Sequence, residues 1–351
     1  MSLHDGKRRI SASDLSVFAA RILEAGGCAA DAARLTADLL VWANARGIDS
    51  HGVLRIPRYI EMMQLGEMNG KAEPRVVSGF GAIAVLEGNR APGAVGMIRA
   101  MTHAIELARN FGIGWCSARN ITHAGAVGYF AEMAARADHI GIVMTASKPL
   151  MGYVGARVEG VSTNPIAIAA PNPHGAAPVI LDMSTSAAAL GKIMAAKDAG
   201  ASIPLGWGVD AIGRDTTDPE AVKVLLPMAG AKGAGLSLMI EVLGSVLVAN
   251  PLIAPALSGV GKGSFNGITI ALNVQAFGDL GDFHQGMVEL GHAIKNLPRA
   301  EGVSEILLPG ERGAASARST SIDGIALEPA TAAKLAKLAR GFGLPVPDGL
   351  A

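Results

Sequence analysis

The sequence has little cysteine and no excess of charge of either sign. Its 351 residues include two cysteines, Cys28 and Cys116, too few for a disulfide framework or a cysteine-based zinc site. Thirty basic and 30 acidic residues give a formal net charge of zero, so the basic excess typical of nucleic-acid binding is missing. A secretory signal requires an apolar run after its basic residues, and no such run follows the basic residues near the N-terminus. We therefore predict a cytoplasmic protein without a nucleic-acid or membrane partner.

One long stretch without charge could be mistaken for a membrane-spanning helix. Residues Val242 to Gly261 contain no charged side chain, but Asn250-Pro251 and Pro255 interrupt them. Proline breaks a helix, so this stretch is too short to span a bilayer as one helix. We predict a buried helix followed by a loop.

Familiar site motifs are also missing. The sequence has no G-x-G-x-x-G, and in the nearest run, Gly259 to Ser264, serine replaces the last glycine and no predicted strand precedes it. It has no P-loop, no H-E-x-x-H and no G-x-S-x-G. Five histidines have no partners at metal-ligand spacing: His103, His139, His174, His284 and His292. We predict that these histidines are structural or solvated, and that the protein has no metal site.

The pattern of apolar residues predicts a mixed α/β protein. The first hundred residues look helical, with Ser11 or Ser13 capping a helix that begins the chain and buries one apolar stripe. The last sixty residues also look mostly helical. Between them, helical segments alternate with apolar runs that are typical of strands: Ile113–Ser117, Ile140–Thr145, Ile166–Ala170, Val179–Asp182 and Gly267–Asn273.

The first polar cluster in these apolar surroundings contains Ser50, His51 and Arg55. A histidine next to a hydroxyl can act as a general acid or base. In a helical turn, Arg55 lies on the same face as His51, and its guanidinium suits a carboxylate. The cluster therefore fits a substrate with a carboxylate beside a carbonyl or hydroxyl carbon. A surface arginine beside an ordinary helix cap is the alternative.

Four further segments combine small residues with polar groups near expected strand ends or helix starts, where ligands often bind in α/β folds. An ordinary turn or surface role remains open for each. The residues with functional potential in these segments are His123; Thr163, Asp182, Met183, Ser184 and Lys192; Lys232 and Gly233; and Glu311 and Arg312.

Taken together, the five clusters resemble the malate/L-lactate dehydrogenase family of NAD(P)-dependent oxidoreductases, which is distinct from the Rossmann-type lactate and malate dehydrogenases. The resemblance runs from about Leu15 to Leu327. The matching segments are Asp49-Ser50-His51-Gly52-x-x-Arg55, Asn120-x-x-His123, Thr163-Asn164-Pro165, Leu181-Asp182-Met183-Ser184-Thr185-Ser186, Lys232-Gly233 and Pro309-Gly310-Glu311.

The resemblance implies a non-Rossmann nucleotide-binding domain with a mixed, mostly antiparallel sheet at residues 116–280. It implies a helical domain built from residues 1–115 and 281–351, and a homodimer. The family reduces small 2-keto acids to 2-hydroxy acids, or cyclic imino acids to amino acids, with NAD or NADP as the cofactor.

The resemblance also implies residue roles. His51 would donate a proton with Ser50 as its relay partner, and Arg55 would hold the substrate carboxylate. His123 and Thr163 would line the substrate site. The expected cofactor contacts are Asp182, Met183, Ser184, Lys232, Gly233, Glu311 and Arg312.

Lys192 distinguishes two branches of the family. The cyclic imine reductases carry an aspartate at the position that we align with Lys192. A lysine at that position is similar to the hydroxy-acid dehydrogenase branch. A cation near His51 would lower its pKa. We therefore predict a 2-hydroxyacid dehydrogenase with Lys192 among its catalytic residues. The alternatives are a piperideine-2-carboxylate, pyrroline-2-carboxylate or N-alkyl imino acid reductase, and a non-catalytic nucleotide-binding member.

Overall fold

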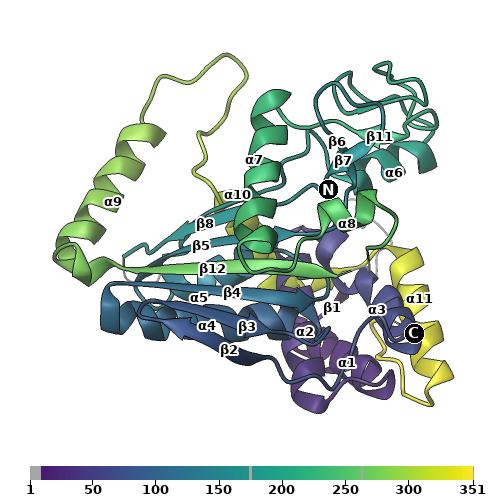
Figure 1. The fold of residues 1–351 in the computed structure, drawn as a ribbon, viewed down its shortest axis with the longest axis horizontal. Coiled ribbons are helices and arrows are strands. Elements are labelled where there is room, and N and C mark those ends of the chain that lie inside the picture. Colours follow the sequence, from purple (N-terminus) through teal and green to yellow (C-terminus); the bar gives the residue numbers. More distant parts are fainter. Residues whose placement is uncertain (1–8, 174–175, 262–263, 351) are drawn as a thin grey trace.

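A seven-stranded sheet forms the centre of the protein (Figure 1). The computed structural model describes residues 9–173, 176–261 and 264–350. The strands lie in the order β2 (Arg75–Phe80), β3 (Ile83–Glu87), β4 (Ile113–Ile121), β12 (Phe265–Asn273), β5 (His139–Ala146), β8 (Ile166–Ala170) and β9 (Val179–Met183). The apolar runs of the sequence predicted five of them, and these five are confirmed: β4, β5, β8, β9 and β12.

The sheet is mixed, as predicted. Strands β3 and β4 are parallel, and the other neighbouring pairs are antiparallel. Strand β12 lies in the middle, where Ile270 pairs with Trp115 of β4 on one side and with Ile142 of β5 on the other. A late segment of the chain is thereby inserted between two earlier ones.

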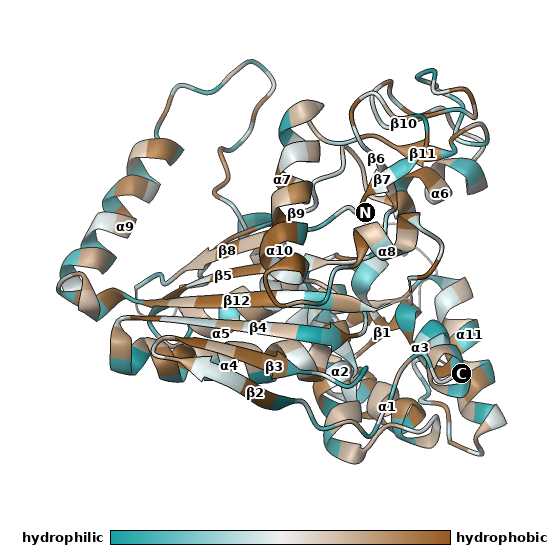
Figure 2. Cartoon of the chain, viewed as in Figure 1, coloured by the Kyte–Doolittle hydropathy of each residue, from teal (hydrophilic) through white to brown (hydrophobic). Residues whose placement is uncertain are grey.

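Helices pack against both faces of the central strands. Side chains alternate along β12, so that Ile268 and Ile270 pack in a cluster with helix α7 (Ala231–Glu241), while Ala271 packs on the opposite face. That opposite face carries α4 (Gly93–Phe111) and α5 (Gly128–Ala135). The hydrophobic colouring of the central strands in Figure 2 fits a sheet covered on two sides.

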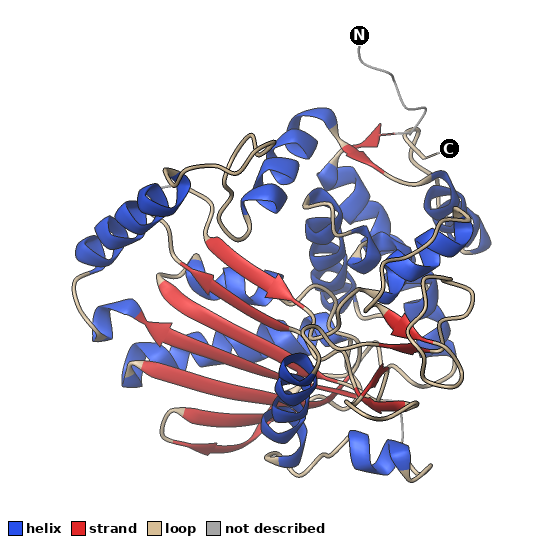
Figure 3. Ribbon diagram, turned by 90° about the horizontal axis from the view of Figure 1, so that it is seen from above, coloured by secondary structure: helices blue, strands red, loops and turns tan. Residues whose placement is uncertain are grey.

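Four helices pack together beside the right-hand end of the sheet in Figure 1: α1 (Ala12–Ala25), α2 (Ala30–Ala45), α3 (Ile56–Gln64) and α11 (Pro329–Gly341). Ser11 caps α1 by accepting a hydrogen bond from the backbone of Asp14, as predicted. Helix α11 contacts α3, although the two are far apart in sequence. Strand β1 (Arg9–Ile10) pairs with β13 (Ile325–Ala326) away from the large sheet (Figure 3).

The remaining elements are short or peripheral. A four-stranded sheet has the order β10 (Gly208–Val209), β11 (Val224–Leu225), β6 (Met151–Gly152) and β7 (Glu159–Val161). The other helices are α6 (Leu190–Asp198), α8 (Ile253–Leu257), α9 (Leu280–Lys295) and α10 (Glu311–Asp323), with a 3-10 turn η4 (Val274–Ala276) and a π-helical turn η3 (Val242–Val246). None of the helices in the described residues is long and apolar enough to cross a membrane.

Two expectations about secondary structure are wrong. The first hundred residues are not uniformly helical, because β2 and β3 form a hairpin there. All six residues of β2 are exposed, so this edge strand has no buried face and no alternating pattern to announce it. The uncharged stretch from Val242 to Gly261 is not a buried helix either. It begins with the π-helical turn, and Leu247 and Val260 are 64% and 75% exposed.

Candidate active site

Two short 3-10 turns carry the first polar cluster. The turns are η1 (Asp49–His51) and η2 (Val53–Arg55), with Gly52 between them. They connect the end of α2 to the start of α3. The helical turn predicted for this segment is therefore interrupted, yet Ser50, His51 and Arg55 are still brought together.

Asn44 clamps these two turns from the end of α2. Its side-chain nitrogen donates to Asp49 Oδ1 at 2.6 Å, and its Oδ1 accepts the backbone N–H of Val53 at 2.8 Å. Gly52 packs directly against the amide, since a Cβ at this position would lie 2.2 Å from Asn44 Oδ1. One buried amide thus binds the Asp49 side chain before His51 and the Val53 backbone after it.

Ser50, His51 and Arg55 are joined by hydrogen bonds. Ser50 Oγ lies 3.0 Å from His51 Nδ1, and Arg55 Nε donates to the backbone oxygen of Ser50 at 2.7 Å. Among the described residues, neither Nη nitrogen of Arg55 has a protein acceptor. The fork of the guanidinium is therefore oriented by the protein and available to a carboxylate.

His123 joins this cluster from the loop between β4 and α5. Its ring centroid lies 5.6 Å from that of His51, with an angle of 22° between the two planes. Tyr59 on α3 lies with its hydroxyl oxygen 2.7 Å from His123 Nδ1. Phe265 at the start of β12 packs edge-on against His123, with the centroids 5.7 Å apart. The predicted grouping of His123 with His51 is present in the structure.

Burial and one nearby cation set the charge state of the two histidines. Burial, followed by the positive charge of Arg55, lowers the pKa of His51 to about 4. Burial, Arg55 and His51 lower the pKa of His123 to about 3. Both rings are therefore neutral at neutral pH, and Arg55 is the cation that the cluster presents to a ligand.

A buried ion pair anchors the preceding helix. Arg46, which ends α2, donates to Glu132 of α5 at 2.7 Å and stacks on Trp42, and Trp42 Nε1 donates to the same carboxylate at 2.8 Å. Arg136 also pairs with Glu132. The chain therefore enters the His51 turns from a helix that is fixed to α5.

The predicted residues near the end of β9 form a second group. Asp182 Oδ2 accepts the backbone N–H of Gly128 at the start of α5, at 2.9 Å. Although Asp182 as a whole is exposed, its carboxyl group packs against Gly128, and burial of that group raises its pKa to about 6. Because α5 follows the His123 loop, this bond ties β9 to the histidine cluster.

Thr163 and Gly233 meet this strand end through Thr185. The backbone N–H of Thr185 donates to Thr163 O at 3.4 Å, and a Cβ on Gly233 would lie 2.7 Å from Thr185 O. Ser184 bonds to Ser186 through their hydroxyls, and Met183 pairs with Ile166 of β8. Gly233 thus lets the start of α7 approach the end of β9.

The predicted charged residues outside these groups are more exposed. Lys192 on α6 lies with its Nζ 5.8 Å from the centre of the Trp207 ring, while its neighbour Gly191 packs beside Ser50. Arg55, rather than Lys192, is the cation that lowers the pKa of His51. Lys232 at the start of α7 is exposed, and so is Arg312 at the start of α10.

Glu311 is part of a local ion pair. It accepts from Lys295 at 2.8 Å and from the backbone N–H of Leu308 at 2.9 Å. The turn before it touches β9, because Ile180 N donates to Pro309 O at 3.0 Å. The Pro309–Arg312 segment therefore lies against the strand that carries Asp182, although Glu311 itself is held by Lys295.

Comparison with known proteins connects this geometry to a family. The family model described as malate/L-lactate dehydrogenase matches residues 10–336. The chain belongs to the malate/L-lactate dehydrogenase family. It is 33% identical to malate/(S)-sulfolactate dehydrogenase of Methanothermus fervidus over 91% of this chain and 94% of that protein. It is 35% identical to ureidoglycolate dehydrogenase (NAD(+)) of Escherichia coli K12 over 84% of this chain and 85% of that protein.

The fold agrees with this membership. The crystal structure of malate dehydrogenase from Entamoeba histolytica superimposes with a TM-score of 0.91 at 26% identity, covering 97% of this chain and 99% of that one. The predicted resemblance is confirmed over almost the whole chain.

Three residues of the site were not predicted from the sequence. Tyr59 lies among apolar residues on the buried side of α3, although its spacing of four residues from Arg55 places both on one helical face. Asn44 was a polar residue among the buried positions of α2, which could have marked a clamp. Phe265 gave no signal, because its contact with His123 depends on the placement of β12 in the sheet.

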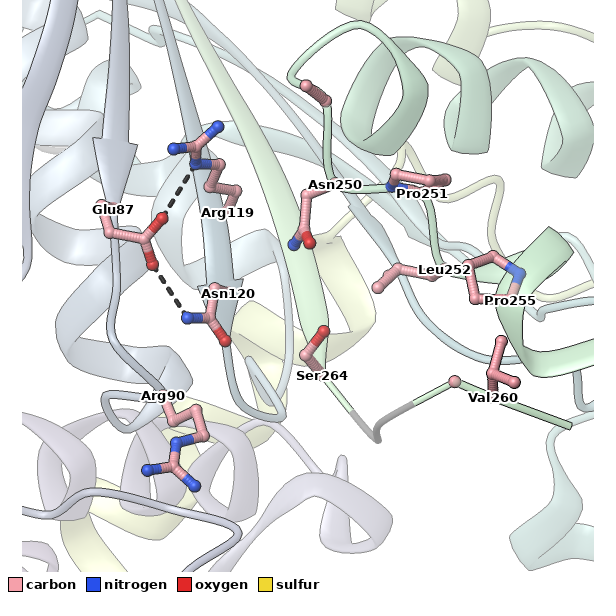
Figure 4. Close-up of a pocket in the computed structure, with 12 residues that line it drawn as sticks. Glu87, Arg90, Arg119, Asn120, Asn250, Pro251, Leu252, Pro255, Val260 and Ser264 are labelled. Carbon is pink, nitrogen blue, oxygen red and sulfur yellow. Dashed lines mark hydrogen bonds and ion pairs between the residues drawn. The ribbon is translucent and has the colours of Figure 1, made fainter.

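A cavity of about 450 Å³ is lined by residues near the ends of β3 and β4 and by the segment that follows η3 (Figure 4). Glu87 forms part of its wall and holds Arg119 and Asn120, each at 2.9 Å. Ser264 also lines the cavity, and the next residue, Phe265, contacts His123. The cavity has both polar and apolar lining residues and lies at the same end of the sheet as the site.

Proposed function

We propose that this chain is an NAD(P)-dependent oxidoreductase that acts on the CH–OH group of small 2-hydroxy acids and reduces the corresponding 2-keto acids. The observation that carries the proposal is the cluster of Ser50, His51 and Arg55, in which a titratable ring lies beside an oriented guanidinium with free donors. Membership of the malate/L-lactate dehydrogenase family supports it.

In the reductive direction, Arg55 binds the substrate carboxylate through its Nη donors. His51 gives a proton to the carbonyl oxygen, and Ser50 orients the ring through Nδ1. The carboxylate also neutralises the charge of Arg55, which is one of the two causes that lower the pKa of His51. Substrate binding therefore raises the pKa of His51 and favours the protonated form that reduction needs.

The residues near the end of β9 fit a dinucleotide. Lys232 at the start of α7 offers an exposed cation, and buried Thr185 Oγ1 has no hydrogen-bond partner among the described residues. This donor set suits phosphate groups, and Arg312 adds a second exposed cation on the segment that touches β9. When bound, the nicotinamide supplies the hydride. Lys192, Thr163 and His123 complete the proposed substrate side.

We further propose a non-Rossmann nucleotide-binding domain at residues 116–280, which contains four whole strands of the seven-stranded sheet and most of β4. Residues 1–115 and 281–351 would form the helical domain, although β2 and β3 of residues 1–115 extend the same sheet and β4 crosses the boundary. One parallel strand pair within an otherwise antiparallel sheet supports the non-Rossmann assignment. The free cysteines Cys28 and Cys116 support a reducing compartment such as the cytoplasm.

The proposal includes a homodimer. Along α7 and the π-helical turn, large apolar side chains recur on one stripe and are substantially exposed: Leu238, Met239, Val242 and Val246. Such a stripe on a helix surface is typical of a protein interface. Light scattering of the purified protein is expected to give about twice the mass of the chain, and a monomer would contradict the dimer.

The test of the activity is a panel of oxidants. The purified protein is mixed with NADH or NADPH and with pyruvate, oxaloacetate, 2-ketoglutarate, glyoxylate or a cyclic imine, with and without methylamine. Loss of reduced-nicotinamide absorbance with a plain keto acid is the expected result. Turnover with only the imine or the added amine identifies an imino acid reductase, and binding without any turnover identifies a non-catalytic member. Both outcomes contradict the proposal.

A further inference from the structure

Tyr59 and His123 form an isolated hydrogen-bonded pair within the site. Tyr59 is 3% exposed, and its hydroxyl oxygen lies 2.7 Å from His123 Nδ1. Among the residues that the structure describes, the Tyr59 hydroxyl and His123 Nδ1 have no hydrogen-bond partner other than each other, and His123 Nε2 has none. The position of the proton in this single bond therefore determines which nitrogen of His123 carries its own proton.

The surroundings decide which group donates. A buried hydroxyl needs an acceptor for its proton, and leaving it without one costs free energy. Arg55 is the charged group that interacts electrostatically with Tyr59. A guanidinium has donors but no acceptor, so Arg55 cannot accept the proton of the phenol hydroxyl. Burial raises the pKa of Tyr59, so the phenol keeps its proton. Tyr59 therefore donates and His123 Nδ1 accepts.

We propose that Tyr59 is a positioning residue that holds neutral His123 in the tautomer with its proton on Nε2. His123 then presents an N–H donor beside the His51 ring, whose centroid is 5.6 Å away. In both rings Nδ1 is engaged by a hydroxyl, from Tyr59 in one and from Ser50 in the other. The Nε2 atom of each ring is left for a ligand.

The two histidines would then have different tasks. His51 exchanges a proton with the substrate oxygen, whereas His123 keeps its proton and donates a fixed hydrogen bond to an oxygen of the 2-keto acid. A neutral donor suits this position, because an imidazolium would add a second positive charge near Arg55 and would lose the bond from Tyr59. The identity of the acceptor rests on the proposed function, but the tautomer of the free protein does not.

The tautomer can be measured directly. In full-length protein labelled with ¹⁵N-histidine, long-range ¹H–¹⁵N NMR at neutral to mildly alkaline pH distinguishes a protonated ring nitrogen from an unprotonated one. The signals of His123 are identified by their loss in His123→Gln. In the wild type we expect the proton on Nε2. In Tyr59→Phe, which keeps the ring but removes the donor, we expect the Nδ1 and Nε2 signals to shift towards a mixture of tautomers.

A matched substitution separates this effect from a general loss of packing. Tyr129→Phe removes a phenol hydroxyl from α5, where the ring packs against Trp42, and should leave the His123 signals and turnover unchanged. Tyr59→Phe should lower kcat/KM by about tenfold, the size expected for one hydrogen bond. A wild-type proton on Nδ1, or unchanged His123 signals in Tyr59→Phe, overturns the inference. Wild-type protein without keto-acid turnover overturns the proposed function instead and leaves the NMR result standing.

Discussion

The two sides of the candidate site are held in different ways. On the proton-transfer side, His51 and His123 each bond through Nδ1 to a hydroxyl, and Asn44 fixes the backbone around His51. On the proposed cofactor side, Lys232 and Arg312 are exposed, and their side chains have no hydrogen bond or ion pair among the described residues. The rings that must be placed within tenths of an ångström are fixed by the chain itself, whereas the cations remain free for an anionic ligand.

The largest effect is expected on the fixed side, at the proton donor. His51→Ala removes positioned proton transfer and should lower kcat by at least about a hundredfold, with cofactor affinity unchanged. His103→Ala, which removes a histidine paired with Glu106 on α4, is the matched control and should keep its activity. Turnover of His51→Ala close to the wild-type rate would remove His51 from the mechanism.

Arg55 should affect binding more than turnover. Arg55→Ala loses charge-assisted hydrogen bonds to a carboxylate that is present in both the ground state and the transition state, so KM should rise by roughly 10- to 100-fold. Arg58→Ala removes an exposed arginine that pairs with Glu61 and Glu67 and should leave KM unchanged. An unchanged KM with a collapsed kcat in Arg55→Ala would contradict the proposed role.

The clamp on the backbone should have a smaller effect. Asn44→Ala removes the bonds to Asp49 and Val53, and kcat/KM should fall by about tenfold because His51 loses its fixed position. Asn110→Ala removes an exposed amide of α4 as a control. If Asn44→Ala lowers thermal stability but leaves kcat/KM at the wild-type value, the amide has no part in positioning the site.

On the open side, a substitution should affect the cofactor alone. Lys232→Ala should weaken the binding of reduced cofactor by about three- to tenfold, as for one exposed charged contact, while the free energy of unfolding changes by less than about 0.5 kcal/mol. Lys334→Ala, at an exposed position of α11, is the control. Unchanged cofactor affinity in Lys232→Ala, measured by fluorescence titration, would place the dinucleotide elsewhere.

The last contrast concerns stability rather than rate. The pKa of His123 is about 3 in the folded protein, whereas a histidine in an unfolded chain has a pKa of about 6.5. Between these values the unfolded chain binds more protons, so the free energy of unfolding rises with pH through this range and is fully gained above it. His123→Gln should reduce the rise in the urea midpoint between about pH 4 and pH 7. The same rise in variant and wild type would contradict the shift.

The apolar pattern of the sequence was sufficient for five strands but not for the β2–β3 edge of the sheet. Strands β4, β5, β8 and β12 are largely buried and have apolar runs, and the half-exposed edge strand β9 still carries the apolar run Val179–Leu181. Strand β2 is exposed along its whole length, and neither burial nor alternation distinguishes it from a loop. The strand order was also beyond prediction, because nothing local in Phe265–Asn273 indicates insertion between β4 and β5.

The same limit applies to the site. Residues close together in sequence, such as Ser50, His51 and Arg55, were grouped correctly because their spacing within a turn already placed them together. Tyr59 and His123 are 64 positions apart, and their contact depends on how α3 packs against the loop that follows β4. The exposed cations were named from the family pattern, and their contacts stay predictions until a cofactor is bound.

The pairing of the chain ends has a consequence for biosynthesis. Arg9 donates to the backbone oxygen of Gly324, 315 positions further along, and α11 packs against α3 and the turn that carries Arg55. On the ribosome, α1 to α3 emerge early and must wait for these partners until nearly the whole chain has been made. Contacts of such long range form slowly. The contacts that support the histidine cluster are therefore among the last to form, and a nascent chain that stalls between residues 192 and 329 carries every proposed catalytic residue without the support of α11.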